Sequence, residues 1–174
     1  MILDLSPFLE KEVEPSEAKV SYDEDSVSIK GSAYRKLRSE LFTLTFYNDR
    51  GLKLFVSGKT EVSFLSPCDR CLSDVEITIP VSLSEEFDIR EDQIFYDEED
   101  GVSPVSENCL DVDYLVKNEI LYNWPSKVLC KEDCKGICPV CGKNRNVSPC
   151  SCDTFVPDPR MAKFLDVFNE SKEV

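Results

Sequence analysis

The stretch CKGICPVCGKNRNVSPCSC, residues 134–152, places five cysteines within nineteen residues of a chain that contains no histidine. The N-terminal segment MILDLSPFLEKEVEP has neither the basic head nor the small-residue cleavage site of a signal peptide, so we expect a cytoplasmic protein with reduced thiols. A disulfide framework is therefore disfavoured, and metal binding is the better explanation of the nine cysteines. Without histidine, a metal cage must consist of thiolates, or of thiolates with carboxylates.

Eight of the nine cysteines fall into four close pairs. The pairs are Cys68 with Cys71, Cys130 with Cys134, Cys138 with Cys141, and Cys150 with Cys152. Because a tetrahedral zinc ion takes two such pairs, joining neighbouring pairs predicts one site from the first two and another from the last two. We expect one or two zinc ions. Other partitions stay open, such as Cys130 or Cys134 joining the last pairs and leaving the first pair free.

The segment CPVCG has the features of a metal-binding knuckle, since Pro139 restricts one dihedral and Gly142 can adopt a positive φ. Two alternatives remain for the cysteine pairs. Four thiolates can hold an iron–sulfur cluster. Cys68 and Cys71 can form a redox dithiol, although that motif usually lies between a strand and a helix, whereas both flanks here indicate strands. Cys109 stands alone, and we interpret it as a small buried apolar residue.

The net charge of −14 argues against attraction of the whole surface to nucleic acid, but the charge is uneven. Residues 30–59 hold seven basic and two acidic side chains, and residues 126–152 hold five and two. These segments suit RNA phosphates, or they are ordinary solvated surface that offsets the charge of the thiolates. The candidate RNA-binding residues are Arg35, Lys36, Arg38, Lys131, Lys135, Lys143 and Arg145.

The apolar pattern predicts strands over residues 41–47, 52–65 and 75–83. Gly58 suggests a bulge or turn in the second strand, and Pro80 suggests that the third lies at an edge or is kinked. The acidic stretch 84–108 is interpreted as a mobile surface loop.

Two helices complete the predicted fold. The first begins at a cap provided by Asp111 or Asp113 and stops at Pro125, and Val112, Leu115, Val116 and Ile120 have helical spacing. Asp158 and Pro159 begin a closing helix, whose apolar stripe consists of Met161, Phe164, Leu165 and Phe168. We therefore predict an α+β fold with an antiparallel β-sheet, two helices and a C-terminal cysteine-rich, zinc-ribbon-like module. Residues 1–125 would form the sheet-plus-helix core and residues 126–174 the module and closing helix, in one integrated domain.

Three stretches together resemble a known family. They are SPCDRCLSDVEITIPVSLSEEF, then DVDYLVKNEILYNWPSKVLCKEDCKGICPVCGKNRNVSPCSC, then DPRMAKFLDVF. In this order they resemble the YceD-like large ribosomal RNA subunit accumulation family of bacteria and plastids, over about residues 31–168. The resemblance implies a role in 23S rRNA accumulation and large-subunit assembly, without enzymatic activity. It also implies that the site around Cys68 and Cys71 is the shared one, because some members lack the second cysteine block.

The sequence thus predicts a non-enzymatic factor for large-subunit biogenesis. Its expected partners are the large-subunit precursor, through 23S rRNA or basic ribosomal proteins, with no membrane and no small-molecule substrate. The basic segments would approach RNA, and the acidic stretch 84–108 would engage a basic ribosomal protein. The alternatives are a thiol–disulfide redox protein that uses Cys68 and Cys71, and a zinc-bearing adaptor that binds only proteins.

Overall fold

A computed structural model describes residues 1–9, 15–96 and 102–153, and the chain divides into two compact units. The first, the sheet unit, comprises Met1–Pro67 and Asp74–Val128. The second, the cysteine unit, comprises Cys68–Ser73 and Leu129–Val174. The two segments of the cysteine unit lie far apart in the sequence. The first is the connection between two long strands of the sheet unit, and Asp74–Val128 of that unit separates it from the second.

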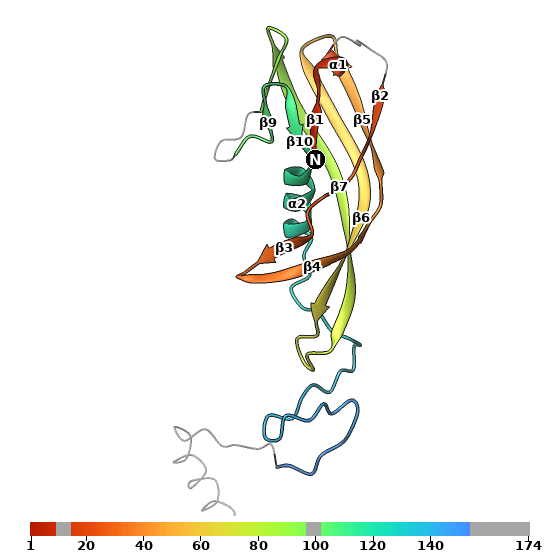
Figure 1. Ribbon diagram of the computed structural model, residues 1–174, viewed down its shortest axis with the longest axis vertical. Coiled ribbons are helices and arrows are strands. Elements are labelled where there is room, and N and C mark those ends of the chain that lie inside the picture. Colours follow the sequence, from red (N-terminus) through yellow and green to blue (C-terminus); the bar gives the residue numbers. More distant parts are fainter. Residues whose placement is uncertain (10–14, 97–101, 154–174) are drawn as a thin grey trace, which may run out of the picture. The chain divides into compact units, whose positions relative to one another are not determined.

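The main sheet of the sheet unit is antiparallel throughout its described strands (Figure 1). These strands are β2 (Ser16–Val20), β3 (Ser26–Ile29), β4 (Ser32–Ser39), β5 (Phe42–Asp49), β6 (Lys53–Pro67), β7 (Asp74–Arg90) and β8 (Gln93–Phe95). Strand β6 is central, since β7 pairs along one of its edges from Lys53 to Pro67. Along the other edge, β5 pairs with residues 53–58 and β4 with residues 62–65.

A smaller antiparallel sheet has the order β1 (Ile2–Asp4), β10 (Cys109–Asp111) and β9 (Val105–Ser106). The described helices are α1 (Ser6–Leu9) and α2 (Val112–Tyr122). Asp111 caps α2, because its carboxylate accepts a hydrogen bond from the backbone N–H of Tyr114 at 3.1 Å. Asp113, the other candidate cap, instead pairs with the Met1 ammonium group.

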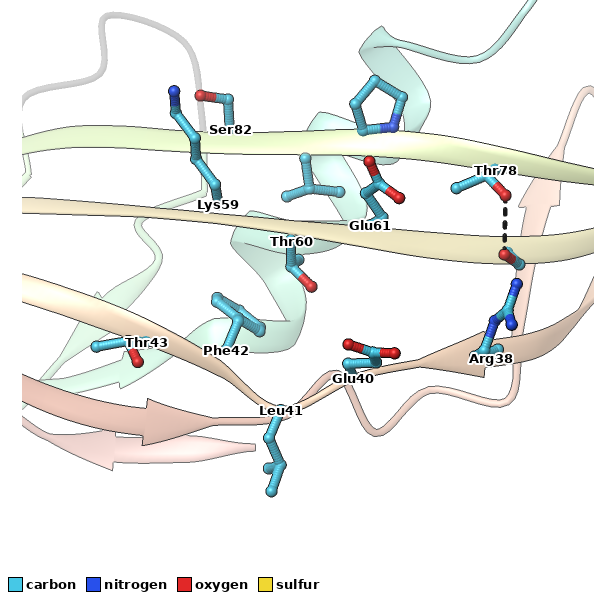
Figure 2. A pocket seen from close by; sticks show the side chains of 13 residues that line it. Arg38, Glu40, Leu41, Phe42, Thr43, Lys59, Thr60, Glu61, Thr78 and Ser82 are labelled. Carbon is cyan, nitrogen blue, oxygen red and sulfur yellow. Dashed lines mark hydrogen bonds between the residues drawn. The ribbon is translucent and has the colours of Figure 1, made fainter.

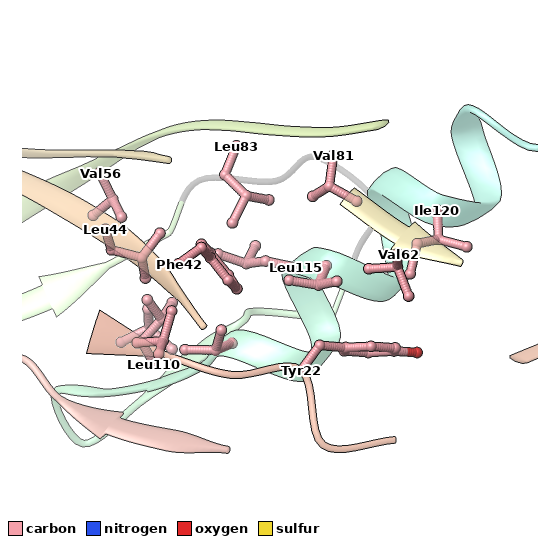
Figure 3. Packing of buried hydrophobic residues seen from close by; sticks show 14 of the residues in the cluster. Tyr22, Phe42, Leu44, Val56, Val62, Val81, Leu83, Leu110, Leu115 and Ile120 are labelled. Atoms are coloured by element: carbon pink, nitrogen blue, oxygen red, sulfur yellow. The ribbon is translucent and has the colours of Figure 1, made fainter. Parts of the chain in front are cut away.

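The core forms between the buried side chains of the sheet and the buried side chains of α2. Along β5, Phe42, Leu44 and Phe46 alternate with more exposed residues and are buried. Helix α2 buries its own stripe, made of Val112, Leu115, Val116 and Ile120, as the spacing predicts. Figure 3 shows Leu115 and Ile120 of α2 next to the side chains that the sheet contributes to this core. The prediction of a mainly antiparallel α+β fold is therefore confirmed.

The three predicted strands are present as β5, β6 and β7, but two details differ. Strand β6 passes through Gly58 without a bulge or turn, and its register with β5 and β7 stays regular there. Gly58 is needed for close packing instead, because an added Cβ would lie 2.7 Å from Leu44 Cδ2. The proline prediction holds, since β7 pairs with β8 only from Asp88 to Arg90 and, among the described strands, lies at an edge at Pro80.

The prediction of a surface loop over residues 84–108 is wrong for much of that range. Residues 84–90 continue β7, residues 93–95 form β8, and β9 lies further on. The ladder with β6 holds residues 84–88 in a strand although they are acidic, because their backbone pairs and Phe87 is buried. Residues 97–101 and the predicted closing helix after Asp158 lie outside the described residues.

Helix α1 was not predicted, and Cys109 is half-buried on β10 rather than fully buried. Among the described residues, no helix is long and apolar enough to cross a membrane.

Candidate metal centres

The thiols of the cysteine unit gather into two groups of four, and within each group all four sulfur atoms lie within 4.8 Å of one another. Site 1 consists of Cys68, Cys71, Cys130 and Cys134, and site 2 of Cys138, Cys141, Cys150 and Cys152. All nine cysteines lie in the described part of the chain, and none forms a disulfide. The structure thus brings together the neighbouring pairs that the spacing joins.

The sulfur separations fit a single tetrahedral ion. Zinc–sulfur bonds of about 2.3 Å place the sulfurs of a tetrahedron about 3.8 Å apart. In site 1, Cys68 Sγ and Cys134 Sγ are 3.8 Å apart, and Cys71 Sγ and Cys130 Sγ are 3.5 Å apart. A disulfide would need about 2.05 Å. In a polynuclear iron–sulfur cluster the four thiolates are divided among two or more irons, and thiolates on different irons stand further apart, so each group suits one ion better.

The first pair of site 1 lies on a tight turn. The backbone N–H of Leu72 donates to Cys68 O at 2.9 Å, and the N–H of Cys68 donates to Ser73 O at 2.8 Å. Leu72, directly after the second cysteine, has a positive φ of 60° and an exposed side chain. Gly142 holds the equivalent place after Cys141 in site 2, with a φ of 70°, as the sequence predicts. Two knuckles of the same backbone design therefore present the first pair of each site.

Hydrogen bonds from the backbone prepare Cys68 to lose its proton. Burial by itself raises the pKa of a thiol, but the backbone N–H groups of Arg70, Cys130 and Cys71 outweigh burial and lower the pKa of Cys68 to about 6. The Ser73 hydroxyl and backbone N–H similarly lower the pKa of Cys71. The hydrogen bond with Cys71, together with burial, raises the pKa of Cys130 to about 12.

Site 2 shows the same division. The backbone N–H groups of Cys141 and Val140 lower the pKa of Cys138 to about 6. The hydrogen bond with Cys141, followed by burial, raises the pKa of Cys152 to about 12. Each group therefore combines at least one thiol of lowered pKa with one thiol of raised pKa. If all four thiols of a group lost their protons, the four thiolates would repel one another. A metal cation among them would offset this repulsion, which is the chemistry expected of a metal site.

Three neighbours of the thiols were not found from the sequence. The Ser73 hydroxyl contacts Cys71 Sγ at 2.9 Å, and Arg70 Nη1 donates to Cys134 O at 2.9 Å. Asn146 Nδ2 donates to Cys134 Sγ at 3.3 Å, from a loop that belongs to site 2. Ser73 and Arg70 could have been suspected because they lie within two residues of a cysteine. No sequence signal links Asn146 to Cys134.

The candidate RNA-binding residues are divided between the units. Arg35, Lys36 and Arg38 lie on β4 of the sheet unit. Lys36 Nζ donates to Tyr22 O at 2.7 Å and lies over the Tyr22 ring, so this side chain already has a structural role. Arg38 pairs with Glu76 at 3.0 Å, but this ion pair is exposed. The other four candidates lie in the cysteine unit, where each is exposed: Lys131, Lys135, Lys143 and Arg145.

A groove of about 1000 Å³ lies where β4 ends and β5 begins, alongside β6 and β7 (Figure 2). Its charged side chains are of both signs, Arg38 and Lys59 with Glu40 and Glu61. The remaining polar lining consists of hydroxyl groups, including Ser63 and Thr78, whose oxygens are 3.0 Å apart. The lining contains no cysteine, so the groove is separate from the two cysteine groups.

Residues 56–167, well over half of the chain, match the family described as large ribosomal RNA subunit accumulation protein YceD. The chain belongs to this family. Its membership relates it broadly to the large ribosomal subunit, and the resemblance seen in the sequence is thereby confirmed. The matched range contains all eight paired cysteines, so both sites lie in the part that defines the family match.

Two relatives illustrate the similarity. The uncharacterized protein YlbN of Bacillus subtilis is 30% identical over 149 residues, which cover 84% of this chain and 77% of YlbN. The uncharacterized protein Rv2926c of Mycobacterium tuberculosis is 28% identical over 123 residues, or 69% of this chain. The chain spans 58% of the length of that mycobacterial relative. No solved structure matches the chain.

Proposed function

We propose that this chain is a non-enzymatic factor for biogenesis of the large ribosomal subunit, acting in the cytoplasm on an assembly intermediate that contains 23S rRNA. We further propose that sites 1 and 2 each hold one structural zinc ion. The family match supports the ribosomal role, and the composition of the cysteine unit supports the zinc.

The buried residues of the described part of the cysteine unit are four cysteines, Cys68, Cys71, Cys134 and Cys138, together with Gly136. In the same described part, the apolar side chains of Leu72, Val140 and Val147 are exposed. With so little apolar burial in the part of the unit that the structure describes, covalent or metal cross-links would stabilise its fold. Because its cysteines are free thiols rather than disulfides, bound metal is the cross-link that we propose.

The donor set also supports a structural rather than a catalytic zinc. A catalytic zinc keeps one coordination position for water or substrate, whereas four thiolates close the coordination sphere. Four thiolates around one divalent ion carry a net charge of −2. The exposed side chains of Lys135, Lys143 and Arg145 offset this charge and remain long enough to reach a phosphate.

Charge suggests how the factor would bind its intermediate. The basic side chains of the cysteine unit and of β4 would contact the RNA backbone, and the acidic end of β7 would face a basic ribosomal protein. The contacts would be with phosphates rather than bases, so binding would weaken as salt increases.

Sedimentation tests the ribosomal role. The full chain should co-sediment with large-subunit precursors in sucrose gradients, and its depletion should reduce mature large subunits and 23S rRNA. The double variant Lys143→Glu/Arg145→Glu should lose co-sedimentation. Lys19→Glu/Lys117→Glu changes the net charge equally within the sheet unit and serves as the matched control. Normal subunit profiles after depletion, or equal behaviour of the two variants, would contradict the proposal.

The lowered pKa of Cys68 also favours a second candidate, a thiol–disulfide redox protein that uses Cys68 and Cys71. Cys68 is 0% exposed, however, and a redox thiol must be reachable by its partner. Thiol labelling separates the two functions. Zinc-loaded protein should resist labelling at both cysteines until a chelator is added, whereas a redox dithiol would be labelled at once.

A zinc-bearing adaptor that binds only proteins is the remaining alternative. A gel shift with a 23S rRNA fragment addresses it, because an adaptor would leave the RNA unshifted at any salt concentration.

A further inference from the structure

We propose that Asn146 couples the two cysteine sites, so that a metal ion in site 2 raises the affinity of site 1 for its own ion, and the reverse. The inference rests on the metal binding proposed above. By sequence Asn146 belongs to site 2, because it lies in the loop 142–149 between Cys141 and Cys150. By contact it belongs to site 1, because its side chain touches Cys134.

The side-chain amide of Asn146 holds one end of site 1 from two directions. Its Nδ2 donates to Cys134 Sγ at 3.3 Å, and its Oδ1 accepts from the backbone N–H of Lys135 at 2.9 Å. An N–H group that donates to sulfur stabilises the thiolate more than the thiol, and it also orients the sulfur. Asn146 is therefore a positioning residue that acts on the metal through Cys134.

The loop presents Asn146 in a defined conformation. Asn144 Oδ1 accepts from both the backbone N–H and the Nδ2 of Asn146, each at 2.9 Å. At the start of the loop, the backbone N–H of Cys138 donates to Lys143 O at 2.9 Å, so a ligand of site 2 is bonded to the loop itself. The position of Asn146 thus depends on contacts that belong to site 2.

Metal in site 2 would restrain both ends of this loop. Cys141 and Cys150 flank it, and their sulfurs lie within the 4.8 Å span of site 2. A loop with both ends fixed samples fewer conformations than a loop with one free end, so the contact from Asn146 to Cys134 then costs less conformational entropy. By thermodynamic linkage, an ion in site 1 favours an ion in site 2 by the same factor.

A parallel backbone connection also joins the two sites. The N–H of Ile137 donates to Arg70 O at 2.9 Å, and the N–H of Arg145 donates to Gly136 O at 2.9 Å. Truncation of Asn146 leaves these bonds in place, so the variant Asn146→Ala isolates the side-chain contribution. Removal of one hydrogen bond to a metal ligand commonly lowers metal affinity by about 10- to 100-fold, which sets the expected size of the coupling.

A double-mutant cycle on the full chain tests the coupling, with Co²⁺ as the probe and cobalt–thiolate absorption as the signal. Cys150→Ser/Cys152→Ser opens site 2, and the affinity of site 1 is then measured with and without Asn146→Ala. Opening site 2 should weaken site 1 by about 10- to 100-fold when Asn146 is present. The same change should have a much smaller effect in the Asn146→Ala background. Equal weakening in both backgrounds, or none in either, would overturn the coupling.

A second measurement keeps both sites intact. In protein loaded with Cd²⁺ and observed by cadmium NMR, Asn146→Ala should shift the resonance of site 1 and leave that of site 2 in place. Val147→Ala, at an exposed position in the same loop, should shift neither. If two ions bind independently and the site 1 resonance is unchanged in Asn146→Ala, the coupling is refuted but the proposed zinc sites are not. A wild-type chain that binds no metal would contradict the proposed zinc sites themselves, and the coupling with them.

Discussion

Replacing Gly136 with alanine should weaken metal binding far more than the same change at Gly142. Both glycines have a positive φ, 73° at Gly136 and 70° at Gly142, so alanine is strained equally at the two positions. Their surroundings differ. An added Cβ at Gly142 has no atom within 4 Å, whereas at Gly136 it would lie 2.9 Å from the backbone oxygen of Arg70. Gly142→Ala is therefore a matched control for strain.

The size of the difference follows from these contacts. The left-handed conformation costs alanine about 1–2 kcal/mol in either variant. At Gly136, relief of the close contact must also separate two backbone segments, and the Arg70 oxygen is the acceptor for Ile137 N–H at 2.9 Å. Overpacking costs about 1–3 kcal/mol, and if the segments move apart instead, loss of that hydrogen bond, worth about 0.5–1.5 kcal/mol, is part of this cost. We expect Gly136→Ala to be worse by about 1–3 kcal/mol, or about 5- to 150-fold in metal affinity.

Chelator competition measures this difference. Zinc-loaded full chains are titrated with a chelator while a zinc indicator reports release, and the chelator concentration at half release is compared. Fluorescence of Trp124, which lies in the sheet unit and is the sole tryptophan, reports whether that unit stays folded. Half release at the same chelator concentration in both variants would refute the reasoning, because the contact with Arg70 would then carry no energy.

Three further predictions concern stability. Removing zinc with a chelator should make the cysteine unit sensitive to proteolysis but leave Trp124 fluorescence unchanged. If the protease resistance and the native fluorescence are lost together, the two units are not stabilised separately. Gly58→Ala should lower the free energy of unfolding, measured in urea, by about 1–2 kcal/mol. Overpacking against Leu44 and Thr43 costs more than alanine gains by making the unfolded chain stiffer, and an unchanged urea midpoint would contradict this prediction. Tyr22→Phe should be neutral or stabilising, because the buried Tyr22 hydroxyl has no hydrogen-bond partner among the described residues. Burial raises the pKa of Tyr22 to about 12, so wild type should lose stability between about pH 10 and 12, and Tyr22→Phe should lack this part of the loss in urea unfolding at each pH.

The strands and the helix after Asp111 were predictable because their apolar residues repeat with the period of the structure they form. Residues 84–90 were not, because their acidic composition suggested a loop, while a ladder with the far half of β6 decides their conformation. Non-local pairing of this kind leaves no local signal. Gly58 was misinterpreted for a similar reason, since the atoms that exclude a side chain there belong to Leu44 and Thr43 on another strand.

The grouping of the thiols was predictable to a greater degree. Close cysteine pairs are a local feature of the sequence, and joining each pair to its neighbouring pair is the simplest way to divide four pairs between two sites. The residues around the thiols were harder to predict. Asn146 reaches Cys134 across twelve residues, and only the folded loop shows that a side chain from one site contacts a sulfur of the other. Such contacts depend on loop conformation, which composition does not specify.

The described parts of the two units differ in what they bury, and this difference bears on where the candidate metal sites lie. The sheet unit buries aliphatic and aromatic side chains such as Phe64, Phe87 and Leu110, and it needs no ion to exclude water. The connection from β6 to β7 is held at its ends by pairing of Pro67 with Asp74, so the Cys68–Cys71 turn is restrained before any metal binds. The second pair of site 1 has no such ladder. An ion in site 1 would therefore order mainly the segment after Val128, and loss of the ion would release that segment with its basic side chains while the sheet unit stayed folded.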